Sequence, residues 1–372
     1  MTALIYYSSV DIFLDENNQH FLDKIPGGVE FSYVNRSFAP NLFICDRTGV
    51  ITTPIKTKVL PMAVVPAFQK SEKSFSEICD NRAKELLAKA EQTSRKLVVM
   101  YSGGVDSTLI LCSLIKNATD EQLKNVVVLL NQDSIDENPN FFRDYIIKKF
   151  NCVSSYKFPY YLGNDNYIFT SGENGDQLMG STLIREYRKK KTPDDVFKSV
   201  KGNEHLIIDF FSMQGGSVYS ENLFHLYKKL ADAATIQIDT IYKYFWWMNF
   251  CLKWQNVYVR MLAYSQNRST LKLDENYNSF YGTQDFQLWA MNNCGNILVK
   301  EPYNTKLHMK EYILDVNGDV EYINKPKIGS LGALFRRKGN VFSIDENLNY
   351  SNEYPGEEYY NFENDFIGLG KK

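Results

Sequence analysis

One segment of the chain joins an apolar strand, a glycine-rich turn and an apolar helix without interruption. Residues 96–116 read KLVVMYSGGVDSTLILCSLIK. The run KLVVM has the composition of a strand, and from Val105 onwards the apolar residues recur at helical spacing. A strand that turns directly into a helix is the arrangement that a pyrophosphate-binding loop requires. This segment therefore constrains the fold and the chemistry more than any other part of the sequence.

The turn carries groups that bind an anion at the start of a helix. Its residues are Ser102, Gly103, Gly104, Val105, Asp106 and Ser107. The first N–H groups of a helix lack intrahelical partners and the macrodipole is positive there, so polyphosphate is stabilised. The glycines let the backbone approach the anion, Ser102 and Ser107 add hydroxyl donors, and Ser107 is expected to cap the helix. We expect these residues to bind a nucleotide through its phosphates.

Asp106 is the unusual member of this turn. A carboxylate beside phosphates repels them unless a cation lies between, which predicts Mg2+ held by Asp106 and phosphate oxygens. The alternative is a plain strand–turn–helix, in which the glycines serve only the turn and the serine only the helix end. The turn is not a Walker loop, since no Gly-Lys-Ser/Thr sequence closes it.

The six residues resemble the PP-loop of the ATP pyrophosphatase superfamily. Members of that superfamily cleave ATP between the α and β phosphates and so adenylate a substrate. The resemblance implies ATP and Mg2+ as cofactors of this chain. It also implies AMP and pyrophosphate, in place of ADP, as products.

Length, composition and charge narrow the class of protein. The chain has 372 residues, a hydrophobic content of 44% and a net charge of −2. This length accommodates two or three domains, and the charge gives no general attraction to nucleic acid or anionic membranes. The first residues lack a basic n-region, and no run reaches the roughly 18 apolar residues of a membrane span. We expect a cytoplasmic protein without a membrane partner.

The sequence pattern divides the chain into three ranges. Residues 1–95 combine short apolar runs such as VEFSYV, which predict a small β-rich region, with a linker helix within 71–94. Residues 96–340 are predicted to form the synthetase-like domain, and residues 341–372 a C-terminal tail with little periodicity.

The middle range opens with strands that alternate with helices. Apolar runs at 96–100, 126–131 and 167–170 are predicted strands, with a helix near 140–150. This order predicts an α/β fold with a doubly wound parallel sheet. The second half is predicted to be mainly helical, and its aromatic segment 241–264 is interpreted as a buried core helix.

A second glycine-rich loop follows the predicted strand at 167–170. Residues 170–181 read TSGENGDQLMGS and resemble the SGEGSDE-type loop of asparagine synthetases. The resemblance implies that Asp176 joins Asp106 as a Mg2+ ligand and that Gly172 contacts the nucleotide. It also implies that Glu173 is catalytic, facing the activated acyl group or the incoming amine.

Two further segments resemble the same family. Residues 324–330, NKPKIGS, resemble its RPKxGF-type segment, whose lysine stabilises the pentavalent α-phosphorus, which makes Lys327 the candidate catalytic lysine. Residues 128–139 resemble the second strand and the loop that contact adenine and ribose. The candidates there are Val128, Leu129, Ser134 and Glu137.

The chain also departs from that family. Around 271–291 the E-x-R-x-P-F-L-D segment is not recognisable, which leaves the acyl substrate open. The chain begins Met1-Thr2, without the cysteine nucleophile of glutamine-dependent asparagine synthetases, and the region before the loop is too short for the usual glutaminase domain. We expect ammonia, a free amine or a separate ammonia-supplying protein to provide the nitrogen.

The expected function is that of an asparagine synthetase-like, AMP-forming ligase that joins a small carboxylate to ammonia or another amine. One alternative is a PP-loop enzyme that modifies nucleobases or nucleic acid. The basic run at 185–191 favours it, whereas six cysteines without CxxC spacing and only four histidines disfavour it. The other alternative is a non-catalytic nucleotide-binding protein that acts by interaction.

Overall fold

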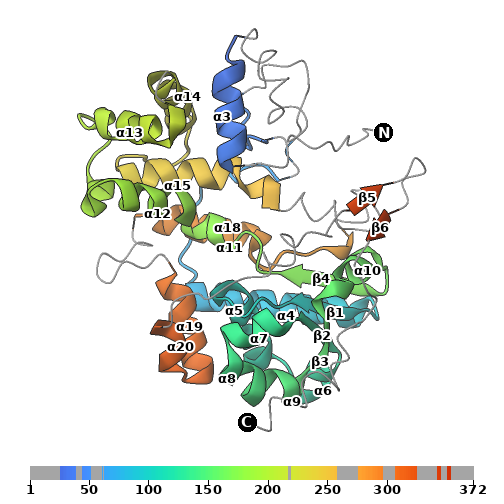
Figure 1. Ribbon diagram of the computed structural model, residues 1–372. Coiled ribbons are helices and arrows are strands. Elements are labelled where there is room, and N and C mark those ends of the chain that lie inside the picture. Colours follow the sequence, from blue (N-terminus) through green and yellow to red (C-terminus); the bar gives the residue numbers. More distant parts are fainter. Residues whose placement is uncertain are drawn as a thin grey trace. The chain divides into compact units, whose positions relative to one another are not determined.

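The computed structural model divides the chain into two compact units, each built from three separate segments (Figure 1). Unit 1 comprises Met1–Glu72, Asn174–Arg260 and Gln284–Thr305, and unit 2 comprises Lys73–Glu173, Met261–Thr283 and Lys306–Lys372. The structure describes residues 26–38, 44–51, 61, 63–216, 219–257, 275–295, 306–324, 342–344 and 350–352. The ranges predicted from the sequence, 1–95, 96–340 and 341–372, are contiguous, whereas both units are discontinuous.

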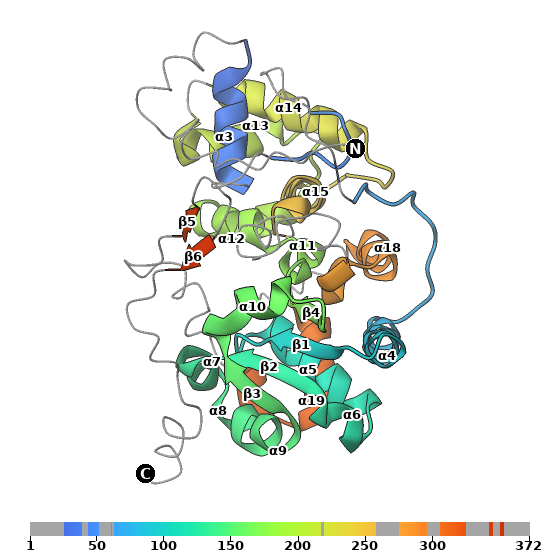
Figure 2. The same ribbon diagram turned by 90° about the vertical axis from the view of Figure 1, so that its right-hand side faces the viewer.

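Unit 2 contains a four-stranded parallel sheet (Figure 2). Its strands are β1 (Lys96–Met100), β2 (Val126–Leu130), β3 (Asn151–Ser154) and β4 (Tyr167–Ser171). Their order across the sheet is β3-β2-β1-β4, and all three pairings are parallel. The predicted alternation of strands and helices is thus confirmed as an α/β fold with a parallel sheet.

The sheet contains one strand that the sequence pattern missed. Every residue of β2 is buried, as expected for a strand covered on both faces, and its VVVLL sequence was recognised by that continuous apolar run. In contrast β3 reads NCVS, with only Ser154 buried. It pairs with β2 alone, whereas β4 at the opposite edge is also bridged to Tyr277 through Phe169. The predicted third strand is therefore the fourth, β4.

Helices of unit 2 precede, connect and follow these strands along the chain, and α4 and α5 pack on β1. The predicted linker helix is α4, which packs on β1 and α5. It begins after Ser74, and the side chain of Ser74 accepts the N–H of Glu77 at 3.1 Å. The helices of unit 2 are α4 (Phe75–Gln92), α5 (Val105–Asn117), α6 (Asp120–Lys124), α7 (Gln132–Glu137), α8 (Pro139–Phe141), η1 (Phe142–Ile146), α9 (Ile147–Lys149), η2 (Ser155–Lys157), α10 (Phe158–Gly163), η5 (Phe280–Gly282), α19 (Leu307–Asn317) and α20 (Val320–Asn324). A hairpin of β5 (Phe342–Ile344) and β6 (Tyr350–Asn352) also belongs to unit 2.

Among the described residues, unit 1 is helical. Its elements are α3 (Gly28–Phe38), α11 (Gly175–Met179), α12 (Ser181–Lys190), η3 (Pro193–Phe197), α13 (Glu204–Phe211), η4 (Ser212–Gly216), α14 (Ser220–Asp232), α15 (Ile241–Leu252) and α18 (Gln284–Asn293). None of the helices that the structure describes in either unit is both long and apolar enough to cross a membrane.

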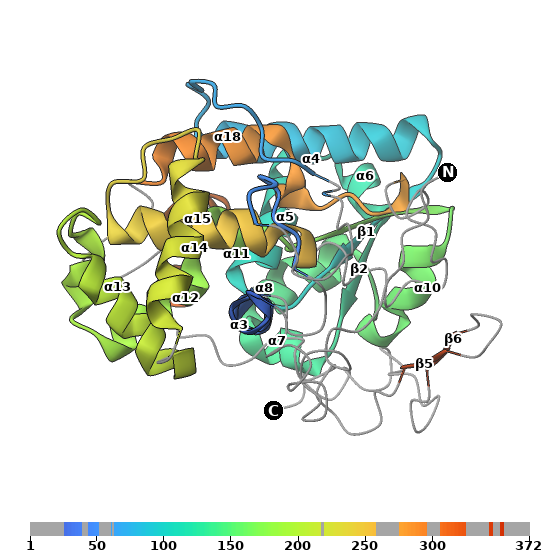
Figure 3. The ribbon, with the colours of Figure 1, turned by 90° about the horizontal axis from the view of Figure 1, so that it is seen from above.

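Helix α15 forms the core of unit 1, which confirms the first part of the core helix predicted over 241–264. The helix ends at Leu252, and residues 258–264 lie outside the described part of the chain. Helix α15 packs against α11, α12 and α14, and Figure 3 shows it among them. The indole N–H of Trp246 donates to the Leu178 carbonyl at 2.7 Å, and that of Trp247 donates to the Leu230 carbonyl at 2.9 Å. Both rings are therefore buried with their polar atoms satisfied, the condition under which tryptophan stabilises a core.

A buried arginine joins the N-terminal part of the chain to this core within unit 1. The Arg47 side chain is 2% exposed and donates to the carbonyls of Ala63 at 2.6 Å, Val64 at 3.0 Å and Phe250 at 3.1 Å. It also donates to the side chain of Gln287 and lies over the ring of Trp254 at 4.5 Å. Burial lowers the pKa of its guanidinium to about 10, so the group is still charged at neutral pH.

The prediction of a β-rich N-terminal region is wrong where the structure describes it. The run VEFSYV lies inside α3, and the described residues before Lys96 contain no strand. Phe31 and Val34 are buried and lie three residues apart, so they share one face of a helix, whereas a strand would place them on opposite faces. The aromatic and β-branched composition had favoured a strand, and helical packing outweighed it.

Candidate functional site

The glycine-rich turn lies at the carboxyl end of β1 and leads into α5. Gly103 has φ +75°, and Gly104 is the N-cap residue of α5, with extended backbone. A Cβ atom at Gly103 would lie 2.4 Å from the Ser134 carbonyl oxygen and 2.6 Å from Glu137 Cβ. Both the backbone angle and the space therefore require glycine at this position.

Substitution of Gly103 tests how tightly the turn is built. We expect Gly103→Ala to lower the free energy of unfolding by about 3 kcal/mol or more, because strain at positive φ adds to a clash with α7. Gly318→Ala is the matched control in the same unit, since Gly318 has φ +68° and nothing within 4 Å of its would-be Cβ. It should cost about 1–2 kcal/mol. Urea unfolding followed by far-ultraviolet circular dichroism measures both, and equal losses would contradict the close approach.

The two serine hydroxyls of the turn bond to the turn itself. Ser107 Oγ accepts the N–H of Ser102 at 3.1 Å and donates to the Gly104 carbonyl at 3.1 Å. Ser102 Oγ lies 3.1 Å from Ser107 Oγ. The expectation that Ser107 caps α5 is wrong, because Gly104 is the N-cap residue and no side chain bonds there. Ser107 lies in the first turn of the helix, so its hydroxyl reaches back to the loop. The hydrogen bonds of this hydroxyl stabilise the conformation of the loop.

Two buried tyrosines donate hydrogen bonds to carbonyl groups of this turn. Tyr281 donates to the Asp106 carbonyl at 2.8 Å, and Tyr322, in α20, donates to the Gly103 carbonyl at 2.9 Å. Tyr281 is fully buried and Tyr322 is 8% exposed. Burial, with the nearby Asp106 carboxylate as a further cause, raises the pKa of both hydroxyls above the usual range. They therefore remain protonated donors and orient the amide groups of the turn.

Asp106 forms an ion pair with a lysine from the far end of the chain. Lys306 Nζ lies 2.5 Å from Asp106 Oδ2, and the two side chains are 19% and 22% exposed, respectively. Sequence reasoning missed Lys306, because a single lysine two hundred residues away carries no local signal. The cation that the structure places against Asp106 is an ammonium, so the carboxylate does not by itself require a metal ion.

The second glycine-rich loop packs against the first. Strand β4 neighbours β1, and a Cβ atom at Gly172 would lie 2.9 Å from Asp106 Cβ and 3.3 Å from the Ser107 nitrogen. The Glu173 carbonyl accepts the Ser279 hydroxyl at 2.8 Å, and the Ser171 hydroxyl lies 2.8 Å from that of Tyr277. The structure thus brings Gly172 to the turn that contains Asp106, and Glu173 follows it directly in the chain. The roles of both residues stay predictions.

These two loops meet where the strand order of the sheet reverses. From β1 the chain proceeds outward to β2 and β3 on one side, and then returns to place β4 on the other side. Both loops follow the carboxyl ends of β1 and β4. In open α/β sheets, ligands bind at such a switch point.

The residues predicted to contact the nucleoside lie deeper in the fold. Val128 and Leu129 lie in β2, and their side chains are fully buried. Because β2 pairs with a strand on each side, their backbone groups are engaged within the sheet. Ser134 is 1% exposed, and its hydroxyl lies 2.9 Å from the Tyr101 carbonyl. Glu137 is 5% exposed and lies against Gly103. The structure gives Ser134 and Glu137 a role in supporting the turn, and their contact with a nucleotide stays a prediction.

The structure does not test the other two predicted site residues. Asp176 lies in α11 of unit 1, where its carbonyl accepts the N–H of Gly180 at 2.9 Å, so its pairing with Asp106 stays a prediction. Lys327 lies outside the described residues.

The donor set allows a magnesium ion only in company with phosphate. Within the described part of the chain, no group of three or more histidine, cysteine, aspartate or glutamate side chains is placed to hold a metal ion. Mg2+ is usually bound by one or two carboxylates together with substrate phosphates. Asp106, at the start of α5, fits that mode, and a metal ion held by protein ligands alone does not fit.

The cysteines offer no nucleophile for the alternative chemistries. All six are unpaired, and all but Cys152 are buried. Burial raises the pKa of Cys45 to about 12 and raises that of Cys112 as well. Thiols of this kind are protonated and unreactive at neutral pH.

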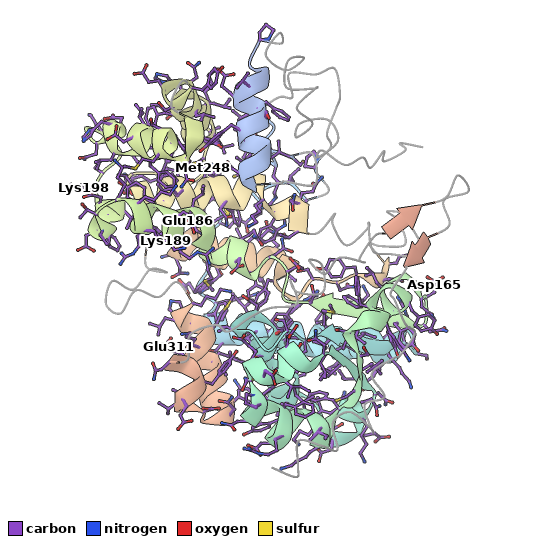
Figure 4. All side chains as sticks on the ribbon, viewed as in Figure 1. Asp165, Glu186, Lys189, Lys198, Met248 and Glu311 are labelled. Carbon is purple, nitrogen blue, oxygen red and sulfur yellow. The ribbon has the colours of Figure 1, made fainter. Side chains whose placement is uncertain are left out.

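The basic run on α12 is partly paired with neighbours in unit 1. Figure 4 labels Glu186 and Lys189 on this helix, and their charged groups lie 3.1 Å apart. The other contacts are Arg185 with Glu186 at 3.5 Å, Arg188 with Asp194 at 4.0 Å, Lys190 with the Met213 carbonyl at 3.4 Å and Lys191 with Asp209 at 3.3 Å. Three carboxylates thus offset part of the charge of five basic residues, which weakens the support that the run gives to a nucleic-acid site.

No protein-family model matches this chain, and neither does any curated protein. The assignment of a function therefore depends on the residues and geometry described above.

Proposed function

We propose that the chain is an AMP-forming carbon–nitrogen ligase of the asparagine synthetase-like kind. It would use ATP to adenylate a small carboxylate and would join that carboxylate to ammonia or another amine. The observation that carries the proposal is the junction of two glycine-rich loops at the switch point, where Gly172 packs on Asp106. A nucleotide-dependent enzyme with a parallel sheet places its substrate at such a position.

The proposal also includes a more specific class for the α/β fold. We assign the sheet to the doubly wound, PP-loop ATP pyrophosphatase class. The strand order β3-β2-β1-β4 and the absence of a Walker sequence after β1 support this assignment. In this class the substrate carboxylate would attack the α-phosphorus and pyrophosphate would leave, so the nucleotide product would be AMP in place of ADP.

The residues of unit 2 account for binding and orientation of the nucleotide. The phosphates would lie against the first-turn amides of α5. These amides precede the first hydrogen bond of the helix, in which the N–H of Thr108 donates to the Gly104 carbonyl at 2.9 Å. Ser107, Tyr281 and Tyr322 fix these amides before substrate arrives. Catalysis of this kind depends on positioning and on charge stabilisation.

Charged groups would complete the site. Asp106 would hold Mg2+ together with phosphate oxygens, and the metal ion, when bound, would supply neutralisation of phosphate charge. Glu173 lies in the loop beside Asp106 and would face the acyl group or the amine. Lys327 and Asp176 keep the roles that the family resemblance implies, as part of the proposal.

The identity of the products tests this function. We expect the purified chain, supplied with Mg-ATP, ammonium and a pool of small carboxylic acids including aspartate, to form AMP and pyrophosphate with only one acid. Chromatographic separation of AMP from ADP measures the outcome and identifies the substrate class at the same time. ADP as product would contradict the proposal. Nucleotide binding without turnover across the pool would favour the interaction protein.

A further inference from the structure

The ion pair between Asp106 and Lys306 has a function beyond the proposed reaction. An isolated carboxylate in the first turn of α5 would repel any polyphosphate bound there, despite the favourable helix dipole. Lys306 Nζ lies 2.5 Å from this carboxylate, so the negative charge is offset inside the protein. The pair is neutral overall, so the carboxylate of Asp106 no longer opposes the amides and the dipole of α5 with a full negative charge.

The position of Lys306 is fixed by the packing of α19. Lys306 directly precedes this helix, whose Met309 and Ile313 are fully buried and whose contacts with α5 are extensive (Figure 1). Tyr312 is 2% exposed and donates to the carboxylate of Asp80 on α4. Lys306 therefore approaches Asp106 from a rigid helix.

The same C-terminal pair of helices contacts the turn a second time. Tyr322 in α20 donates to the Gly103 carbonyl, so α19 and α20 supply one cation and one hydroxyl to residues 103–106. Neither contact is present in the strand–turn–helix segment itself. The loop becomes a complete anion site only when these helices are in place.

We propose that Lys306 is the fixed countercharge of Asp106, and that it enables the turn to bind inorganic pyrophosphate or a nucleotide polyphosphate before any metal ion is bound. The inference rests on the proposed function for the identity of the ligand. Lys306 is a positioning residue in this role, because it acts through Asp106. A lysine that only anchored α19 would have no such effect on anion binding.

The test measures the binding of inorganic pyrophosphate to the full chain by calorimetry, with EDTA and at constant ionic strength. We expect Lys306→Met to weaken binding about tenfold, because Asp106 then repels the anion. Lys149→Met is the matched control, because Lys149 also pairs with an aspartate of unit 2, Asp120 at 3.2 Å, and the affinity of this variant should stay within about twofold of the unmodified chain. The double variant Asp106→Asn with Lys306→Met should recover most of the lost affinity, because it removes the uncompensated charge.

The outcomes separate this inference from the proposed function. Equal affinities for the unmodified chain and Lys306→Met, or failure of the double variant to recover, overturn the inference alone. Pyrophosphate binding that occurs only when Mg2+ is added also overturns the inference and leaves the proposed function intact. Absence of binding under both conditions overturns the proposed function and the inference together.

Discussion

Replacing Asp106 by asparagine is expected to lower the rate of AMP formation by about 10² to 10³-fold, the usual effect of removing one group that stabilises transition-state charge. The amide has nearly the same shape as the carboxylate but is a poor ligand for Mg2+. The fold should remain, because the amide keeps the volume of the carboxylate and an oxygen that can still accept a hydrogen bond from Lys306. Initial rates of AMP release, measured at saturating ATP, test this expectation.

Asp120→Asn provides the matched control for this experiment. Asp120 lies in the same unit and also pairs with a lysine, Lys149, at 3.2 Å, but its side chain is 83% exposed. The control loses one carboxylate and one ion pair, so a purely electrostatic effect on the whole protein would appear in both variants. Turnover by Asp106→Asn at the rate of the control would remove Asp106 from the mechanism.

Replacing Arg47 by methionine is expected to lower the free energy of unfolding of unit 1 by about 3 kcal/mol. The change leaves three backbone carbonyls and the Gln287 side chain without their donor, and an unsatisfied buried acceptor costs about 1–3 kcal/mol. Removal of the buried charge offsets part of this sum. All four tryptophans of the chain lie in unit 1, so tryptophan fluorescence during urea unfolding reports on this unit selectively.

Two further variants sharpen this test. Arg185→Met removes a guanidinium from the same unit, but that side chain is 62% exposed and pairs with Glu186 at only 3.5 Å, so its effect should stay within about 0.5 kcal/mol. Arg47→Lys keeps the charge and loses the planar fork that reaches several acceptors, so we expect an intermediate loss of about 2 kcal/mol. Coincident unfolding curves for Arg47→Met and Arg185→Met would show that the contacts of Arg47 are energetically unimportant.

The sequence was informative where short-range patterns coincide with tertiary structure. Strand β2 is a continuous apolar run, and β1 and β4 contain the apolar runs LVVM and YIF, because a parallel sheet buries both faces of its strands. Helix α4 shows its cap and its periodicity locally. The same rules failed for β3, which is short, polar and mostly not buried, and for α3, whose β-forming residues fold as a helix. In both places the environment outweighed the local preference.

The sequence by itself determined the turn at residues 102–107, because glycine at positive φ and an amide-rich helix start are local requirements that only certain residues meet. It also determined that the loop at 171–173 follows a strand. Only the tertiary structure decided what surrounds Asp106: Lys306, Tyr281 and Tyr322 come from segments 175 to 219 residues away from their partners in the turn. Electrostatic and hydrogen-bond partners act through space, so no spacing along the chain reveals them.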